Sequence, residues 1–190
     1  MKAEDKDINF LQDPRLKASE LIFDGAILRL YLNQIELENK QIVARELLHH
    51  QPAAAILAVT NEDKVLLVKQ YRPAIVEEIY EIPAGILDYL ETGTEEAEAG
   101  ALRELEEETG YRAKQIERLS SFYVTPGYLN EEIILFAASD LVKVENPLPQ
   151  DDDEDVTVHE FSRSEVQKML KNGEIKDLKT LYALQIWLNQ

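Results

Sequence analysis

Residues 84 to 111 read AGILDYLETGTEEAEAGALRELEEETGY, and this stretch decides how the rest of the chain is interpreted. Its second half is predicted to form a helix that ends at Gly110, a residue type suited to the position after a helix. At about 100° per residue, Glu104, Glu107 and Glu108 fall within an arc of about 100° on that helix. Carboxylates this close repel each other, whereas Mg²⁺ takes oxygen ligands and bridges carboxylates to phosphates. The spacing therefore favours a divalent-cation site.

Small residues lie upstream on the same side of this helix, which is expected to run from about Thr94 to Thr109. They are Ala97, Gly100 and Ala101. A glycine inside a helix costs about 1 kcal/mol relative to alanine, so the close approach of a loop or ligand would explain it. The alternative is a solvated surface, and on charge alone this interpretation is favoured, because most glutamate-rich helices are solvated.

The composition limits the possible classes of protein. The 190 residues, 45% of them hydrophobic, can form one packed domain with a smaller appendage. A net charge of −17 argues against binding to nucleic acid or to an anionic membrane surface. The lack of cysteine excludes disulfides, a thiolate nucleophile and a cysteine zinc site. No signal peptide or membrane-spanning run is recognisable, so a soluble cytoplasmic protein is expected.

The first 50 residues are predicted to form a small β subdomain. Residues 1–20 are polar and read as a loosely held arm. Three strands follow, at Leu21–Asp24, Ala26–Leu32 and Gln41–Leu48. These strands carry too few apolar residues to be stable alone, so they are expected to cover a partner surface, as in a dimer.

Residues 51–190 are predicted to form the main domain, an α/β fold whose mixed sheet has helices on both faces. Ala53–Thr60 and Val65–Tyr71 read as a buried hairpin around a polar turn. Further strands are expected at Ile79–Pro83, Lys114–Val124, Glu131–Ala138 and Val156–Phe161. Two helices end the chain: one capped near Ser162 or Ser164 and closed by Gly173, and one at Asp177–Leu188.

The string Arg103–Tyr111, RELEEETGY, resembles the helical half of the Nudix box, R-E-U-x-E-E-x-G-U, in which U is apolar or aromatic. Every specified position matches, and Glu95 stands eight residues before the arginine, as in that family. The box has five residues between its glycine and this glutamate, whereas nine separate Gly85 from Glu95. We interpret the difference as four extra residues within Tyr89–Thr94.

Shorter matches, from about Leu21 to the C-terminus, are similar to the ADP-ribose pyrophosphatase branch of the Nudix hydrolases. They are Ala44-Arg45-Glu46, Gln70-Tyr71-Arg72, Glu81-Ile82-Pro83-Ala84-Gly85, and Thr125-Pro126-Gly127-Tyr128 followed by Glu131. The resemblance implies a Nudix-type mixed sheet sandwiched between helices, with a small N-terminal antiparallel β subdomain. It also implies a homodimer, domain-swapped in this branch, that binds substrate between the two chains.

The chemistry implied by the resemblance is hydrolysis of a diphosphate bond, converting ADP-ribose and water to AMP and ribose 5-phosphate. Glu104 and Glu108 would be the principal metal ligands, with Glu107 sharing a second ion and the Ala84 carbonyl completing the first site. Arg103 would orient the carboxylates through a salt bridge, which makes Arg103 and Glu107 catalytic candidates. The cofactor implied is Mg²⁺, with Mn²⁺ as an alternative, in two or more ions per site.

The resemblance also assigns substrate contacts. Arg45 and Arg72 occupy positions that grip phosphate or ribose, because a guanidinium fork fits anionic oxygens. Glu81 and Glu131 occupy positions that hold ribose hydroxyls or water. Tyr128 completes the predicted substrate-binding set. A surface ion pair is the alternative for each of the four charged residues.

A further carboxylate is expected to serve as the general base, because the box carboxylates would be occupied by metal. The acidic run at 151–155 precedes the last strand, where this branch carries its base. Glu154 and Asp152 are the candidates; Glu154 is favoured because its longer side chain reaches further from the loop. Glu131 is next if neither serves.

Two other functions stay open. The longer loop within Tyr89–Thr94 allows a different Nudix substrate, such as another nucleoside diphosphate sugar or a dinucleoside polyphosphate. A protein that senses ADP-ribose without cleaving it is the third hypothesis; the intact box argues against it.

Overall fold

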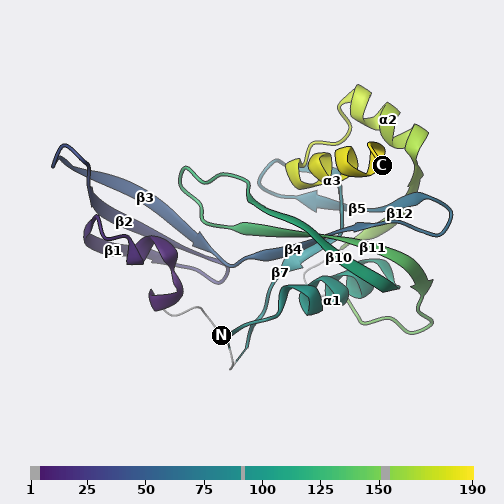
Figure 1. Cartoon of the computed structure of the whole chain (residues 1–190), viewed down its shortest axis with the longest axis horizontal. Coiled ribbons are helices and arrows are strands. Elements are labelled where there is room, and N and C mark those ends of the chain that lie inside the picture. The colour runs from purple at the N-terminus through teal and green to yellow at the C-terminus, as the bar shows by residue number, and fades with distance from the viewer. Residues whose placement is uncertain (1–4, 91–92, 151–154) are drawn as a thin grey trace.

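The computed structural model describes residues 5–90, 93–150 and 155–190 (Figure 1). An N-terminal antiparallel sheet has the strand order β1 (Leu16–Asp24), β2 (Leu28–Glu36), β3 (Ile42–His50). Figure 1 shows this sheet extending away from the rest of the chain. The prediction of three strands before residue 51 is confirmed, although β1 begins at Leu16 rather than Leu21.

Residues 5–15, the described part of the chain before β1, are not the loosely held arm that the polar sequence predicted. Two short 3-10 helices, η1 (Asp5–Asp7) and η2 (Asn9–Gln12), form there. Ile8, between them, is fully buried, and the ring of Phe10 packs edge-on against Tyr31 of β2 with centroids 5.5 Å apart. Two apolar side chains among polar neighbours are therefore enough to hold this segment on the sheet.

The body of the molecule contains two larger sheets. The first has the order β10-β11-β4-β7 and is mixed, because β11 pairs with β4 in parallel while the other pairs are antiparallel. The second is antiparallel, with the order β12-β5-β6. The strand bounds are β4 (Ala53–Ala58), β5 (Lys64–Arg72), β6 (Glu77–Glu81), β7 (Ala84–Ile86), β10 (Tyr111–Tyr123), β11 (Glu132–Lys143) and β12 (Thr157–Ser162). Between β7 and the first helix lies a small ladder of β8 (Tyr89–Leu90) and β9 (Gly93–Thr94).

The predicted hairpin of β4 with β5 is wrong. Both strands exist, but they belong to different sheets and share one bridge, between Val59 and Val65. Every residue of β4 is buried, and β4 takes its ladder partners from β11 and β7 instead. A strand buried on both faces gives no alternation from which its neighbours can be inferred.

Helices cover both faces of the body, as predicted. The helix α1 (Ala97–Thr109) packs Leu105 on one face of β4, against Ile56. On the other side, α2 (Arg163–Asn172) and α3 (Leu178–Leu188) pack on the face that carries Leu57. Alternate residues of β4 therefore serve two separate cores, and Figure 1 shows α1 on the opposite side of the strands from α2 and α3. Within the described part of the chain, no helix has the length and hydrophobicity needed to cross a bilayer.

The helix ends follow the predicted signals. Gly110 has a left-handed φ of 71° and donates its N–H to the Glu106 carbonyl, closing α1. Ser162 and Glu165 form a capping box at the start of α2, and Gly173 closes that helix at a φ of 71°. Asp177 caps α3. These short polar signals fixed the boundaries within a few residues, and the largest difference is that α1 begins at Ala97 rather than near Thr94.

Trp187 anchors the end of the C-terminal helix to the body. Its ring is 1% exposed, and its Nε1 donates to Asp63 at 3.3 Å. The Arg163 guanidinium lies 4.7 Å from the centre of that ring and also binds Asp63. Leu184 is fully buried in the same core, whereas Tyr182 is 42% exposed.

Candidate active site

Two glutamates of α1, Glu104 and Glu108, lie against the short strand β7. Glu104 and Glu108 are 6% and 1% exposed. A Cβ atom at Gly85 would stand 2.1 Å from the Glu104 carboxyl carbon, so only glycine permits this contact. On the other side, the Ala84 N–H donates to Glu108 Oε2 at 2.8 Å. The structure therefore brings the β7 backbone and the box carboxylates together.

Arg103 organises the remaining carboxylates. Its Nη1 donates to Glu104 Oε1 at 2.7 Å and to Glu107 Oε2 at 2.8 Å, and its Nη2 donates to Glu95 Oε2 at 2.9 Å. The hydrogen bond with Glu95, followed by the charge of Glu104, raises the pKa of Arg103 far above its usual value. Burial would raise the pKa of Glu95, but the hydrogen bonds from Arg103 and the Asp88 N–H outweigh it and leave that pKa below its ordinary value.

Gly100 explains the small residues upstream on α1. A Cβ atom there would lie 2.4 Å from Leu87 and 3.0 Å from Glu95 Oε2. The loop that follows β7 therefore approaches the helix as the sequence predicted. It also brings Glu95 within reach of Arg103.

This set of groups fits a hard divalent cation. The candidate ligands are all oxygens, and one guanidinium faces three carboxylates (Glu95, Glu104 and Glu107), with Glu108 next to them. Among residues 5–90, 93–150 and 155–190, no three acidic or histidine side chains are already gathered around one point. Arg103 supplies the positive charge in this arrangement, and its bonds to Glu104 and Glu107 hold those two carboxylates in position.

A second ionic cluster lies at the end of β6. Arg72 Nη2 donates to Glu81 Oε2 at 2.8 Å and its Nε to Glu81 Oε1, a two-bond fork. Lys179 of α3 binds the same carboxylate, and its Nζ also lies 3.2 Å from Asp177. Burial raises the pKa of Glu81, but Arg72 and Lys179 outweigh it and hold that pKa below its ordinary value.

The two clusters are neighbours. The Glu81 hydrogen bond raises the pKa of Arg72, and the charge of Glu108 adds to that shift. The segment between the clusters is fixed at both ends, because the Ile82 N–H donates to Thr180 Oγ1 at 2.8 Å and the Ala84 N–H donates to Glu108. Sequence reasoning assigned Arg72 and Glu81 separately to substrate and did not identify Lys179.

Three predicted substrate residues lie elsewhere in this chain. Arg45 is on β3, where its Nη1 donates to the carbonyl of Ala44. The Tyr128 carbonyl accepts the Leu48 N–H at 2.7 Å, and Glu131 Oε1 lies 3.3 Å from His50 Nδ1. Tyr128 and Glu131 are therefore joined to the end of β3, rather than to α1.

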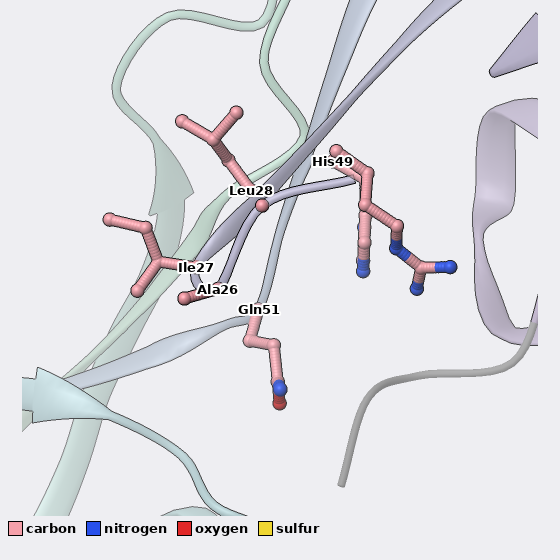
Figure 2. A pocket seen from close by; sticks show the side chains of 7 residues that line it. Ala26, Ile27, Leu28, His49 and Gln51 are labelled. Atoms are coloured by element: carbon pink, nitrogen blue, oxygen red, sulfur yellow. The ribbon is translucent and has the colours of Figure 1, made fainter. Parts of the chain in front are cut away.

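Two hollows lie near this junction. A groove of about 590 Å³ lies between η2, β3 and the turn after β10; its lining includes Phe10, Tyr123, Tyr128 and Asn130. A pocket of about 20 Å³ lies at the β1–β2 turn, where Figure 2 shows Ala26 to Leu28 with His49 and Gln51. The smaller pocket has room for about one water molecule, so it is not a substrate site.

The two candidate bases, Asp152 and Glu154, lie outside the described residues. The chain on either side is held in place. Glu106 on α1 pairs with Arg112 and accepts the Leu148 N–H at 3.2 Å, while Gln150 Nε2 donates to the Val156 carbonyl at 3.2 Å. Glu106 stands at the unspecified position of the box, so the motif gave no indication of this contact.

A family model described as the NUDIX domain matches residues 49–184, which is most of the chain. The chain belongs to the Nudix family. The match begins at the end of β3 and extends into α3, so the N-terminal sheet lies almost entirely outside it.

Two curated Nudix relatives align with almost the whole chain. An ADP-ribose pyrophosphatase of Bacillus subtilis (strain 168) is 44% identical, over 88% of this chain and 89% of its own length. A methanol dehydrogenase activator of Bacillus methanolicus is 43% identical, over 88% of each. A crystal structure described as an ADP compounds hydrolase has a TM-score of 0.74 over 92% of this chain and 93% of its own, at 20% identity. At that identity the structural match shows the fold, which is the Nudix-type arrangement predicted from residues 103–111.

Proposed function

We propose that this Nudix protein is a metal-dependent hydrolase that cleaves the diphosphate bond of ADP-ribose to give AMP and ribose 5-phosphate. The observation that carries the proposal is the placement of Glu104 and Glu108 against β7, with the one guanidinium of Arg103 facing three carboxylates. The B. subtilis relative, named for this activity, supports the choice of substrate.

In the reaction, a water oxygen bonds to one phosphorus while the bridging P–O bond breaks, and one product carries the new oxygen. Arg103 orients Glu104 and Glu107, and the Ala84 N–H fixes Glu108. Mg²⁺ or Mn²⁺, in two or more ions held by these carboxylates and the Ala84 carbonyl, would supply neutralising charge for the diphosphate and activate the water. Arg72 offers a guanidinium fork to a phosphate oxygen.

The general base is proposed to be Glu154 or Asp152, with Glu131 as the next candidate. A carboxylate at this place stays ionised at neutral pH and accepts the proton of the attacking water. Replacing each acid singly with its amide should leave Mg²⁺ binding intact, while one variant loses roughly 10²–10⁴-fold in turnover. Near-normal turnover in all of these variants would show that another residue is the general base.

We further propose that residues 1–50 form a dimerisation subdomain, domain-swapped between two copies, that covers residues 51–190 of the partner. Its sheet exposes large apolar side chains, among them Phe23 at 55%, Ile27 at 62% and Ile42 at 55%. Pairing of two copies would also bring Arg45 of one chain to the active site of its partner. This would give Arg45 the substrate contact that its position on β3 does not give it within one chain. Light scattering should show a dimer at micromolar concentration and a monomer for Phe23→Asp; a monomer for the parent protein would contradict the proposal.

The activity is tested with purified protein, Mg²⁺ and a panel containing ADP-ribose, another nucleoside diphosphate sugar and a dinucleoside polyphosphate. AMP and ribose 5-phosphate from ADP-ribose, at the highest kcat/KM of the panel, are expected. A higher kcat/KM for another compound would support hydrolysis of a diphosphate bond but would show that ADP-ribose is not the preferred substrate. Binding of ADP-ribose without any product would favour a sensor.

A cytoplasmic location stays a prediction of the sequence.

A second candidate function is activation of a methanol dehydrogenase, because the relative named for that effect is nearly as similar as the pyrophosphatase. The test measures the rate of a methanol dehydrogenase with the parent protein and with Glu108→Gln. Activation by the parent alone would link the effect to the α1 site. Activation by both would assign it to binding.

A further inference from the structure

Glu81 has two cationic partners, and they differ in how deeply they are buried. The Glu81 side chain is 2% exposed, the Lys179 side chain 11% and the Arg72 side chain 43%. Lys179 is therefore the inner partner of this carboxylate and Arg72 the outer one. A buried carboxylate needs at least one such partner, because an uncompensated charge away from water is strongly unfavourable.

Lys179 is held in place by the helix that carries it. Asp177 caps α3 by accepting the Thr180 N–H at 2.9 Å, and its Oδ2 lies 3.2 Å from Lys179 Nζ. Thr180 in turn accepts the Ile82 N–H, next in sequence to Glu81. The first turn of α3 is thus tied to the end of β6, which keeps Lys179 beside the Glu81 carboxylate.

Arg72 is placed differently. It is the last residue of β5, before the turn at 73–76, and its side chain is partly open to solvent. Its contact with Glu81 can break without disturbing the core. The Glu81 carboxylate that it binds stands three residues before Ala84, whose N–H donates to Glu108, so the guanidinium lies in the neighbourhood of the α1 carboxylates.

We propose that Lys179 is the permanent counter-ion of Glu81 and thereby a positioning residue that frees the Arg72 guanidinium to bind the diphosphate of the substrate. With Lys179 present, Glu81 keeps a cation when Arg72 moves to a phosphate oxygen. Without it, Arg72 is the one remaining cation that the structure places on Glu81 and stays bound there. This inference rests on the proposed function, because it assumes a diphosphate substrate at the α1 site.

The test is Lys179→Met, which keeps most of the aliphatic stem and removes the charge. The KM for ADP-ribose should rise by roughly tenfold with kcat little changed, because the loss is in binding rather than in chemistry. The affinity for ADP without metal, measured by calorimetry, should fall by a similar factor. Lys179→Arg should restore both values, whereas a role limited to packing would not respond to charge.

The matched control is Lys176→Met. Lys176 pairs with Glu77 at the surface, where both side chains are about half exposed, so the KM should stay at the parent value. Circular dichroism checks that each variant folds. If Lys179→Met does not fold, Lys179→Gln, which can still hydrogen-bond to Glu81, serves the same purpose.

A double-mutant cycle with Arg72→Ala separates an indirect role from a direct one. If Lys179 acts through Arg72, adding Lys179→Met to Arg72→Ala should leave the KM where Arg72→Ala put it. Additive increases, or an unchanged KM in Lys179→Met alone, would overturn the inference. A parent protein that neither cleaves ADP-ribose nor binds ADP would instead overturn the proposed function, so the two failures are distinguishable.

Discussion

The two ionic clusters beside Ala84 differ in their charge balance. In the acid-rich cluster on α1, Arg103 faces Glu95, Glu104 and Glu107, with Glu108 nearby. In the balanced cluster at the end of β6, Arg72 and Lys179 face Glu81, and Asp177 lies 3.2 Å from Lys179 Nζ. An added cation therefore stabilises the first cluster, whereas the second can serve a phosphate oxygen through the Arg72 guanidinium once it leaves Glu81.

The comparison also shows how a protein can hold such groups next to each other. The segment from Glu81 to Ala84 separates the clusters, and its backbone N–H groups bind α3 on one side and α1 on the other. Because both helices are bound to one short segment, the two clusters are kept next to each other. The following predictions disturb one cluster at a time, from the largest expected effect to the smallest.

The largest effect is expected in the acid-rich cluster. Glu108→Gln keeps the size of the side chain but removes a charged oxygen ligand, so kcat/KM should fall by at least roughly 10²-fold with little loss of fold. EDTA should abolish turnover of the parent protein, and millimolar Mg²⁺ should raise its thermal midpoint more than that of the variant. Full turnover by Glu108→Gln, or insensitivity to EDTA, would rule out the metal assignment.

Gly85→Ala should break the geometry of the same cluster without changing any charge. The added methyl would overlap the Glu104 carboxylate, so either β7 or the side chain must move, at a cost of about 1–3 kcal/mol in stability. The kcat/KM of Gly85→Ala should fall together with its stability. Gly127→Ala is the control, because no heavy atom lies within 4 Å of its Cβ position and its φ is not left-handed; it should be neutral on both measurements. Equal effects of the two substitutions would show that the contact with Glu104 does not matter.

The smallest effect is expected in the balanced cluster, as a change in the pH dependence of stability. The pKa of Glu81 is held below its ordinary value of 4.5 in the folded protein, so on acidification the unfolded chain takes up the proton first. The stability that Glu81 contributes is therefore complete above that ordinary value and is lost as pH falls toward its folded pKa. Glu81→Gln should flatten the acid side of a plot of unfolding free energy against pH. An unchanged slope would mean that Glu81 is not held as an anion.

The acid-rich cluster was predictable because its information is local. Positions three and four apart on a helix are neighbours, so Glu104, Glu107 and Glu108 could be placed on one face from spacing alone. The end of α1 at Gly110 followed from the same kind of signal. The contact of Gly85 with Glu104 was not predicted, because it depends on the path of the loop between β7 and α1, which is four residues longer than the pattern.

The balanced cluster was not predictable as a cluster. Glu81 and Lys179 are separated by 98 residues, and no periodic pattern connects β6 with the first turn of α3. The same limit made the pairing of β4 with β5 wrong, because their apolar runs show burial but not neighbours. Sequence patterns here gave the elements and their buried faces, whereas contacts between distant elements depended on the three-dimensional packing.

The position of Trp187 has a practical consequence. It is the single tryptophan of the chain, it is buried on α3, and it lies about two turns after Lys179. Indole emission shifts to longer wavelength when the ring meets water, so the intrinsic fluorescence of the unlabelled protein reports whether α3 is docked. The same signal can follow, in real time and in any variant, whether the helix that carries Lys179 stays in place while substrate binds.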